Sequence, residues 1–428
     1  MIYKEKNIGI IGLGYVGAPL AYLAASKGYN VIGIDKDDTA IENINKRTNI
    51  PKELKEFENF KLIASNDYAI LQNVDTIIVC VPTPTKNNKP DLTILKNVME
   101  DLKDFLKRDS LLIIESTVAP GMTKQYVENF LLKEKGFRVN EYYDLAYCPE
   151  RIDPGNKKYW VGNINRVCGA TSEKALQEAC EFYKSIIDAE IIPMGSIEEA
   201  ELVKVWENSM RNISIAQSNL LAMICDKYSF SVKRLMKGLN SKVEQFGLSL
   251  AYPGIGPGGH CIPEDIHYLI NTSEKNIDIN MNLLKEAVKI NENMPRYAFD
   301  KLVETISKNG DNINKMKILM LGASYKANSA DTRCSQALEL YNIVSKKHKD
   351  TILYDPIANI KFKDIKSQEI FNDSINDAEI IILGCAHDEF LKIDFTDYKN
   401  IKYILDCWNK LDKEKIQKSG ITYIGVGI

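Results

Sequence analysis

Residues 254–265 read GIGPGGHCIPED and place a single cysteine, Cys261, among glycines, two prolines and two acidic residues. A thiolate is a strong nucleophile, and a glycine-rich turn lets the backbone approach a bound ligand closely. A free cysteine is also among the most buried residue types and often serves only as a small apolar side chain. The segment therefore predicts either a catalytic thiol or a packed thiol on a turn, and other parts of the chain must distinguish the two.

Three polar side chains recur at helical spacing in ELVKVWENSMRN, where Lys204, Asn208 and Arg211 stand at i, i+4 and i+7. This spacing places an ammonium, an amide and a guanidinium on one face of a helix. A plain solvated face is the alternative interpretation, and the sequence leaves both open. Asn212 and Asn219 follow among apolar residues, so we expect some of these groups to be buried with hydrogen-bond partners.

Two segments rich in proline and glycine, ESTVAPG and YCPERIDPGN, each follow a predicted buried strand, and they contain Thr117 and Glu150. In an open α/β sheet, the loops beyond the carboxyl ends of the strands line the ligand crevice. We therefore expect Thr117 and Glu150 to face a substrate. The alternative is that the prolines and glycines only form turns.

The hexapeptide GLGYVG sets Gly12, Gly14 and Gly17 in GxGxxG spacing between an apolar strand and a helix-forming stretch. Such glycines allow a tight turn, and the helix N-terminus receives a pyrophosphate. Asp35 ends the second predicted strand, where an acid binds ribose hydroxyls and repels a 2′-phosphate. The pattern predicts an NAD site, although FAD binds through the same fingerprint.

The elements that must position these residues follow from the pattern of apolar residues. The first half alternates short β-branched runs with helix-length polar segments, as in a parallel sheet of βαβ units. From Glu198 to about Gly238 the apolar spacing predicts one long helix, apolar on enough of its circumference to favour a homodimer or larger oligomer. The runs MKILMLGASYKA, TILYDP and AEIIILGCAHDEF then echo the first strands. We predict an α/β protein of two Rossmann-like doubly wound parallel-sheet domains, residues 1–195 and 312–428, joined by a long-helix central region, residues 196–311.

Composition narrows the class of protein. A chain of 428 residues with 45% hydrophobic content is long enough for two or three globular domains. A net charge of −3 with interspersed acids and bases argues against nucleic-acid or membrane-surface binding. The N-terminus lacks the features of a signal peptide, so we expect a cytoplasmic protein. The nine cysteines form no CxxC pair and the four histidines lack zinc-ligand spacing, so we expect neither a disulfide framework nor a metal site.

Seven motifs together resemble the UDP-glucose/GDP-mannose dehydrogenase family, in the family's order and over nearly the whole chain. They are GLGYVG, VPTP, ESTVAPG, PERIDPG, EAELVKVWENSMRN, GPGGHCIPED and SYKANSADTR. The resemblance implies oxidation of a nucleotide sugar's primary alcohol to a carboxylate with two NAD. It also implies two Rossmann-like domains, one for NAD and one for the substrate's nucleotide, linked by a long dimer-forming helix.

The resemblance assigns roles to individual residues. Cys261 attacks an enzyme-held aldehyde, and the thiohemiacetal is oxidised to a thioester that is then hydrolysed. Lys204 and Asn208 match the pair that stabilises the oxyanion, and Asp265 matches the acid that works with ordered water. Glu150 and Thr117 match positions implicated in thioester hydrolysis and water placement. The implied cofactor residues are Gly12, Gly14, Tyr15, Val16, Gly17, Asp35, Pro82, Thr83 and Thr117. The implied substrate residues are Glu150, Arg151, Lys204, Asn208, Arg211, Lys242, Gly258, His260, Lys326 and Arg333.

The expected substrate is a UDP-N-acetylhexosamine, because GGHCIP and PER followed by PG resemble that branch of the family. ERIDPGN favours UDP-N-acetylglucosamine over the manno epimer. Arg151 is expected either to reach the sugar or its phosphates or to be a surface charge, and His260 either to contact the substrate or to pack in its turn. The chain departs from the branch where Lys242 replaces a usual arginine, a point charge in place of a bidentate donor, and where Leu220 and Ile266 replace a usual glutamate and proline.

Other functions remain open on the sequence alone. A UDP-N-acetylmannosamine or UDP-glucose dehydrogenase would share the same chemistry. A two-electron dehydrogenase of the 6-phosphogluconate or hydroxy-acid type would need neither Cys261 nor a second nucleotide domain. A non-catalytic NAD-binding regulatory module would not need the set Lys204, Asn208, Cys261 and Asp265, which favours an enzyme.

Overall fold

The structure is a computed structural model that describes residues 6–55, 57, 60–152, 160–243, 250–276, 279–358 and 368–428. The chain forms two compact units. The first consists of Met1–Glu207 and His267–Asp278, and the second of Asn208–Ile266 and Ile279–Ile428. Among the described residues, no helix combines the length and the apolar character needed to cross a membrane.

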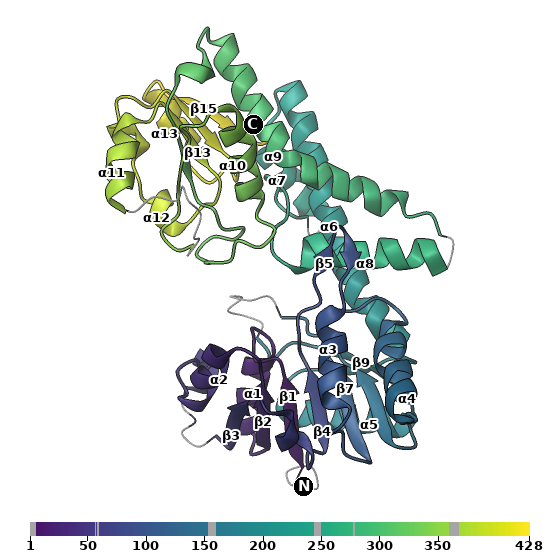
Figure 1. The fold of residues 1–428 in the computed structure, drawn as a ribbon. Helices are drawn as coiled ribbons and strands as arrows, with labels where there is room; N and C mark the ends of the chain where they lie inside the picture. The colour runs from purple at the N-terminus through teal and green to yellow at the C-terminus, as the bar shows by residue number, and fades with distance from the viewer. Residues whose placement is uncertain are drawn as a thin grey trace. The chain divides into compact units, whose positions relative to one another are not determined.

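The first unit is built on an eight-stranded sheet with the order β10-β9-β8-β7-β4-β1-β2-β3 (Figure 1). Its strands are β1 (Asn7–Ile11), β2 (Asn30–Ile34), β3 (Leu62–Ser65), β4 (Thr76–Val79), β7 (Ser110–Ile114), β8 (Tyr143–Tyr147), β9 (Arg166–Ala170) and β10 (Ile191–Pro193). Only β8 and β9 pair antiparallel among these neighbours. The run β3-β2-β1-β4-β7-β8 has the strand order of a dinucleotide-binding Rossmann sheet, whose ligands bind where the order reverses, between β1 and β4. A small hairpin, β5 (Thr85–Lys86) with β6 (Lys89–Pro90), follows β4.

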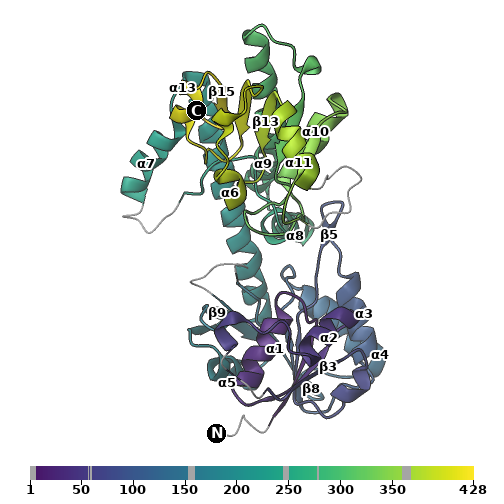
Figure 2. The same ribbon diagram turned by 90° about the vertical axis from the view of Figure 1, so that its left-hand side faces the viewer.

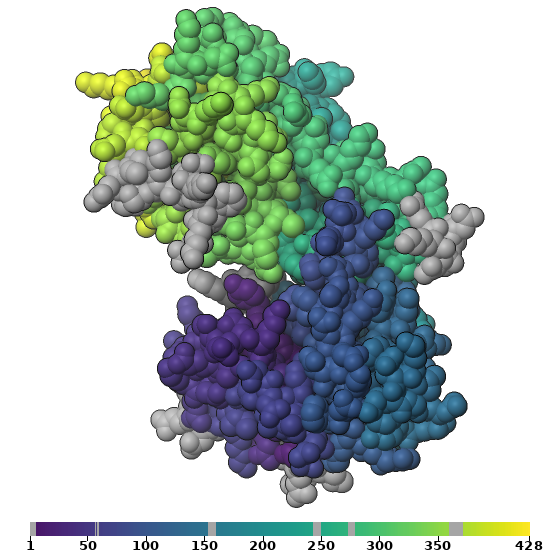
Figure 3. Space-filling view, in the orientation of Figure 1, coloured from purple at the N-terminus to yellow at the C-terminus, as the bar shows by residue number. Residues whose placement is uncertain are grey.

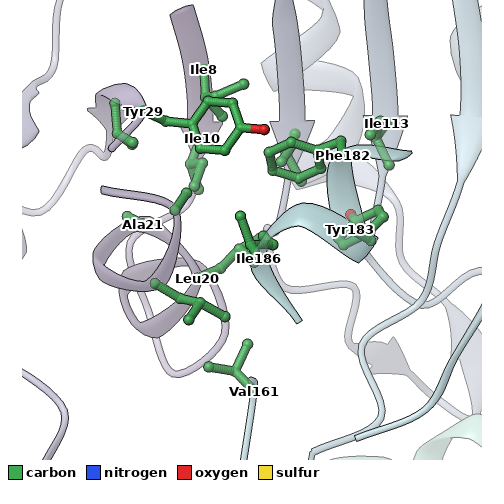
Figure 4. Close-up of a cluster of buried hydrophobic side chains, with 14 of the residues drawn as sticks. Ile8, Ile10, Leu20, Ala21, Tyr29, Ile113, Val161, Phe182, Tyr183 and Ile186 are labelled. Carbon is green, nitrogen blue, oxygen red and sulfur yellow. The ribbon is translucent and has the colours of Figure 1, made fainter. Parts of the chain in front are cut away.

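Helices cover both faces of this sheet because its strands are apolar at successive positions. The helices α1 (Gly17–Ser26) and α5 (Glu173–Ile186) lie on one side, and α3 (Thr93–Leu102) and α4 (Asn129–Lys135) on the other (Figure 2). Figure 4 shows Leu20 of α1 and Phe182 and Ile186 of α5 packed with Ile8 and Ile10 of β1. The helix α2 (Asp38–Asn45) joins the same core. Single helical turns occupy Lys52–Leu54, Tyr68–Leu71 and Lys124–Glu128.

The long helix α6 (Ile197–Tyr228) begins in the first unit and continues in the second. The sequence predicts one helix from Glu198 to about Gly238, and that extent is wrong, because α6 ends ten residues earlier and α7 (Val232–Val243) follows a short break. Ser229 has φ +55°, a left-handed conformation that interrupts a right-handed helix. The Val232 N–H donates to the Gly427 carbonyl oxygen at 2.8 Å, so a contact distant in sequence sets where α7 starts.

The second unit contains a five-stranded parallel sheet with the order β12-β11-β13-β14-β15. Its strands are β11 (Ile318–Leu321), β12 (Ile352–Tyr354), β13 (Ile380–Leu383), β14 (Tyr403–Asp406) and β15 (Thr422–Gly425). One face packs against the end of α6 and against α7, α9 (Asn282–Lys308) and α10 (Gln336–Lys347). The other packs against α11 (Gln368–Asp377), α12 (Asp388–Leu391) and α13 (Lys413–Lys418). Short 3₁₀ turns occupy Ile313–Lys315 and Phe395–Asp397.

Side chains fill the space between the ribbon elements within each unit (Figure 3). Both sheets are doubly wound, which confirms the predicted α/β class with two Rossmann-like sheets and a long central helix. The second sheet has the shorter order of flavodoxin-like folds, in which the ligand crevice also lies beyond the carboxyl ends of the strands.

Candidate active site

The glycine turn after β1 has the geometry that a bound dinucleotide requires. Gly12 has φ +94°, and a Cβ there would lie 2.7 Å from the Cys80 carbonyl oxygen. A Cβ on Gly17 would lie 1.8 Å from the Gly12 carbonyl oxygen, so α1 approaches the turn only because glycine stands there. A Cβ on Gly14 would meet no described atom within 4 Å, which leaves open space beside the turn. The turn therefore fits a pyrophosphate at the N-terminus of α1.

Asp35 follows β2, where the sequence predicts a ribose-binding acid. Its Oδ2 accepts a hydrogen bond from the Leu13 N–H at 2.6 Å, and its Oδ1 accepts one from the Asp37 N–H at 2.9 Å. These bonds orient the carboxylate beside the glycine turn, which also carries Tyr15 and Val16. A carboxylate has further lone pairs that can accept hydrogen bonds from ribose hydroxyls.

The loops after β4 and β7 are joined by hydrogen bonds. Thr83 is buried, and its Oγ1 donates to the Thr117 carbonyl oxygen at 2.6 Å. The Thr83 carbonyl oxygen accepts from the Tyr268 hydroxyl at 2.7 Å, and Tyr268 lies on α8 (Cys261–Asn276). Pro82 is exposed beside them. Three predicted cofactor residues, Pro82, Thr83 and Thr117, are thus gathered at the carboxyl ends of adjacent strands.

Glu201 of α6 holds the rest of the loop that begins at Thr117. Its Oε2 accepts from the Gly121 N–H at 2.6 Å, and its Oε1 accepts from the Thr123 N–H at 2.9 Å. The side chain is fully buried, and burial raises the pKa of Glu201 to about 7 against the opposing effect of these hydrogen bonds. The clamp explains how a loop that contains proline and glycine can hold Thr117 in a fixed place.

Glu150 lies three residues beyond β8 in a buried, charged environment. Its Oε1 is buried and has no hydrogen-bond partner among the described residues. Burial raises the pKa of Glu150 to about 7, while the cations of Lys204 and Arg166 act in the opposite direction. Arg166 is itself fully buried and its Nη1 donates to Glu115 Oε1 at 2.8 Å. A carboxyl group with a pKa near 7 is suited to general-base catalysis at neutral pH.

The predicted polar face of α6 divides into buried and exposed members. Lys204 is buried, with its Nζ 3.8 Å from Glu207 Oε1. Arg151 also binds Glu207, through Nε at 2.9 Å, and its Nη1 donates to the Asn165 carbonyl oxygen at 3.1 Å. Arg211 is exposed. Lys204 therefore belongs to the interior of the first unit, whereas Arg211 does not share its environment.

In the second unit, the candidate nucleophile stands at the start of a helix. Cys261 is the first residue of α8 and is partly exposed, and Asp265 is buried one turn later. The buried Asn208 donates from Nδ2 to Asp265 Oδ2 at 2.6 Å. A helix N-terminus stabilises negative charge, and this favours a thiolate at the first position. The structure thus joins two predicted catalytic residues, Asn208 and Asp265, one turn from Cys261.

A chain of buried asparagines fixes the start of α8. Asn212 donates from Nδ2 to the Ile262 carbonyl oxygen at 3.1 Å, and Asn291 donates to Asn212 Oδ1 at 3.0 Å. Asn219 donates to Asn291 Oδ1 at 2.9 Å and accepts from the Gly254 N–H at 3.0 Å. Asn212 and Asn219 therefore have the burial and the partners that the sequence led us to expect.

The glycines before Cys261 pack against the loop after β11. A Cβ on Gly258 would lie 2.4 Å from Tyr325 Cβ, and the Gly259 N–H donates to the Arg333 carbonyl oxygen at 2.9 Å. The Arg333 guanidinium binds the Asp331 carboxylate, with an Nη2 to Oδ2 distance of 2.6 Å. The two segments can therefore approach this closely only because residue 258 is glycine.

Three other predicted substrate residues lie in the second unit. His260 Nε2 is 3.6 Å from Glu264 Oε2, a contact that His260 makes within its own turn. Lys326 is partly buried in the loop after β11, and Lys242 is exposed on the last turn of α7. The roles of His260, Lys326 and Lys242 in substrate binding remain predictions.

Sequence reasoning missed several residues that support the site. They are Tyr268, which binds Thr83; Arg166, whose charge acts on Glu150; Asn291, which binds Asn212; and Glu201, which binds the loop that carries Thr117. Glu201 lies three residues before Lys204, which was the one available signal. Residue spacing could not show that the carboxylate of Glu201 is buried.

Three family models match the chain in order, all from the UDP-glucose/GDP-mannose dehydrogenase family. The NAD binding domain matches residues 6–187, the central domain matches 198–293 and the UDP binding domain matches 319–413. These matches confirm the family resemblance and NAD as the cofactor.

Similar proteins span almost the whole chain. UDP-N-acetyl-D-mannosamine dehydrogenase of Pyrococcus horikoshii is 30% identical over 431 residues, which cover 98% of this chain and 99% of that protein. UDP-N-acetyl-D-glucosamine 6-dehydrogenase of Salmonella typhi is 29% identical over 427 residues, covering 94% and 97%. The solved structure of UDP-D-ManNAc dehydrogenase from Pyrococcus horikoshii matches with a TM-score of 0.88 at 30% identity, covering 98% and 99%. The chain therefore belongs to the UDP-glucose/GDP-mannose dehydrogenase family and is an NAD-dependent nucleotide-sugar dehydrogenase.

Proposed function

We propose that this enzyme oxidises the primary alcohol of a UDP-N-acetylhexosamine to the corresponding uronic acid and reduces two NAD. The motifs GGHCIP and PER support this substrate class, and the two relatives above are named for N-acetylmannosamine and N-acetylglucosamine derivatives. UDP-N-acetylglucosamine is the epimer that we predict. The observation that carries the proposal is the buried hydrogen bond between Asn208 and Asp265, one turn beyond Cys261 at the start of α8.

The proposal gives each part of the chain a task. Residues 1–195 bind NAD, residues 312–428 receive the UDP group, and residues 196–311 carry the nucleophile and join two subunits. The order of the three matching family domains supports this division. The open space beside Gly14 and the orientation of Asp35 support the cofactor site.

NAD supplies the hydride acceptor for both oxidations. In the first oxidation C6 loses a hydride and its hydroxyl loses a proton, which leaves an aldehyde. The Cys261 thiolate then adds to the carbonyl carbon, forming a C–S bond and an oxyanion that Lys204 and Asn208 stabilise. Loss of the second hydride gives a thioester. Water cleaves the C–S bond, releases the carboxylic acid and regenerates the thiol.

Thioester hydrolysis needs a base and a positioned water molecule. Glu150, whose pKa burial raises to about 7, has the proton affinity of a base that works near neutral pH. Thr117 lies in the loop that Glu201 clamps, which suits a residue that positions water. Asp265 accepts a hydrogen bond from Asn208, and a carboxylate can also take a proton from water or the substrate.

A panel of UDP-sugars monitored for NADH tests this function. UDP-N-acetylglucosamine, UDP-N-acetylmannosamine and UDP-glucose are compared by kcat/KM, and NADH is counted per UDP-sugar consumed. We expect the highest kcat/KM with an N-acetylhexosamine and two NADH per product. One NADH per product would indicate a two-electron dehydrogenase, and a preference for UDP-glucose would reassign the substrate class.

Cys261→Ser tests the covalent step directly. The variant should fold and still bind NAD and the UDP-sugar, because serine is nearly isosteric and position 261 is partly exposed. Turnover to the uronic acid should fall by at least about a thousandfold, because a hydroxyl is a far weaker nucleophile than a thiolate. Supplying the sugar aldehyde should not restore activity, because the lost step follows the aldehyde. Turnover within a few fold of the parent would make Cys261 a structural thiol.

A further inference from the structure

The loop after β11 carries two of the predicted nucleotide contacts and is held by contacts that the reaction scheme does not use. Residues 322–335 stand between β11 and α10, and they include Lys326 and Arg333. The loop is closed on itself where the Tyr325 N–H donates to the Asp331 carbonyl oxygen at 3.1 Å. The Ser335 hydroxyl donates to the Ala323 carbonyl oxygen at 2.6 Å.

The middle of this loop rests on a buried histidine from the segment after β13. The Asn328 N–H donates to His387 Nδ1 at 2.8 Å, and Asn328 Oδ1 accepts from the Asp388 N–H at 3.0 Å. Asn328 has φ +59°, a left-handed conformation that asparagine tolerates better than most residues. Two hydrogen bonds of Asn328, one from its backbone and one to its side chain, therefore connect the loop to residues 387–388.

The hydrogen bonds of the two ring nitrogens define the tautomer of His387. Because Nδ1 accepts a hydrogen bond, the proton of the neutral ring is on Nε2, which donates to Asp355 Oδ2 at 3.0 Å. Asp355 Oδ2 also accepts from the Ala323 N–H at 2.7 Å and the Ser324 N–H at 3.1 Å. Although burial acts to raise it, hydrogen bonds from His387 and from the backbone N–H groups of Ala323, Ala358 and Ile357 hold the pKa of Asp355 far below its usual value. Asp355 thus holds the base of the loop and orients His387, which holds the middle.

We propose that His387 is a positioning residue for nucleotide binding, which presents Lys326 and Arg333 to the UDP group by accepting the Asn328 N–H. This inference rests on the proposed function, because it takes the loop to be the nucleotide site. The ring nitrogens of His387 bind Asn328 and Asp355, which have no part in the proposed reaction. We therefore expect His387 to act on substrate affinity and to leave the chemical steps unchanged.

Two substitutions separate the contacts of the two ring nitrogens. In His387→Asn, the amide oxygen takes the place of Nδ1 and can accept the Asn328 N–H, while the bond to Asp355 is lost. In His387→Gln, the amide nitrogen reaches the place of Nε2 and can donate to Asp355, while the acceptor beside Asn328 is lost. His348→Gln is the matched control, because His348 belongs to the same unit at the far end of α10.

Binding of uridine diphosphate by calorimetry and steady-state kinetics with the preferred UDP-sugar measure the effect on the full-length enzyme. We expect His387→Gln to raise both Kd and KM about five- to tenfold, which is typical for the loss of one hydrogen bond that orders a loop. His387→Asn should stay within about twofold of the parent, and kcat should change little in either variant. His348→Gln should match the parent.

Several outcomes would overturn the proposal. Unchanged uridine diphosphate affinity in His387→Gln, equal loss in both His387 variants, or a fall in kcat without a change in KM would each contradict it. If both variants unfold, hydrogen exchange of the Asn328 backbone amide in the parent enzyme tests the inference, because this N–H donates to His387 Nδ1 and uridine diphosphate should slow its exchange. An exchange rate that uridine diphosphate leaves unaltered refutes the inference. Binding without oxidation of any UDP-sugar would reject the proposed reaction and leave the role of His387 measurable, whereas a parent enzyme that does not bind uridine diphosphate rejects both.

Discussion

Glu150 and Glu201 show how burial changes the chemistry of a carboxyl group. Burial raises the pKa of each to about 7, but their hydrogen bonds differ. Glu201 uses both oxygens to bind backbone N–H groups, which commits it to holding a loop. Glu150 Oε1 is buried without a partner among the described residues, which suits a group that exchanges a proton. The same residue type therefore has a structural task at one position and a proposed catalytic task at the other.

Glu207→Gln should move the acidic limb of the kcat profile to lower pH. Burial is the main cause of the raised pKa of Glu150, and the negative charge of Glu207 adds to it. Removing that charge lowers the pKa of Glu150, so the base form persists to lower pH, by up to about one unit. Measurement of kcat from pH 5.5 to 9 checks this, with the exposed Glu42→Gln as the control. A limb that stays in place, or moves to higher pH, would remove Glu150 from the role of base.

Glu201→Gln should change how stability depends on pH. Because the pKa of Glu201 is raised in the folded state, the folded protein keeps a proton that the unfolded chain releases above its ordinary value near 4.5. The free energy of unfolding therefore contains a contribution from this bound proton, which is fully present below pH 4.5 and is lost as the pH rises to about 7. Glutamine does not titrate, so the free energy of unfolding of the variant should rise relative to that of the parent by up to about 3 kcal/mol between pH 4.5 and 8. Thermal unfolding of both proteins across this range measures the difference, and a difference independent of pH would contradict the prediction.

Helix α6 carries several large apolar side chains that are exposed. Among them are Met210, Leu220, Ile224 and Tyr228. At 100° per residue they fall within about 80° of the helix circumference. A single domain rarely leaves such a stripe in water, which supports our prediction that the helix packs against a second copy of the chain.

Substitution in this stripe should dissociate the oligomer. Ile224→Glu places a charge where an apolar contact is predicted, and burying an unpaired charge is strongly unfavourable. Light scattering should show the parent as a dimer or larger and the variant at the mass of one chain, at micromolar concentration. Lys418→Glu, an exposed change on α13, should leave the mass of the parent unaltered. A parent that is already monomeric would refute the prediction.

The two Rossmann-like sheets each have an aspartate at the same point of the fold, but the two aspartates have different partners. Asp35 follows β2 of the first sheet and Asp355 follows β12 of the second, each bonded to the backbone of the turn after the neighbouring strand. Asp355 is buried and also binds His387, whereas Asp35 makes two backbone bonds beside an open glycine turn. The carboxylate of Asp355 therefore cannot reach a ribose, and the second unit lacks this part of a dinucleotide site.

The enzyme should therefore bind one NAD per chain. Calorimetric titration of the full-length protein with NAD should give a stoichiometry near one, and Asp35→Ala should weaken that binding by about tenfold or more, since it removes the acceptor for two ribose hydroxyls. Uridine diphosphate binding should be unaffected by Asp35→Ala, which serves as the internal control. A stoichiometry near two would show that the second unit also accepts the dinucleotide.

The class of fold, the NAD fingerprint and the family could be predicted from the sequence alone, because they depend on local patterns. Strand alternation, helical spacing and the glycines at 12, 14 and 17 are visible in short windows, and each window dictates its own backbone geometry. Tertiary packing, by contrast, buries Lys204, leaves Arg211 exposed and ends α6 at Tyr228. It alone paired Glu201 with Thr123 and His387 with Asn328, residues separated by 78 and 59 positions. Such pairs leave no periodic signal, because burial and hydrogen bonding between distant segments depend on how whole elements pack.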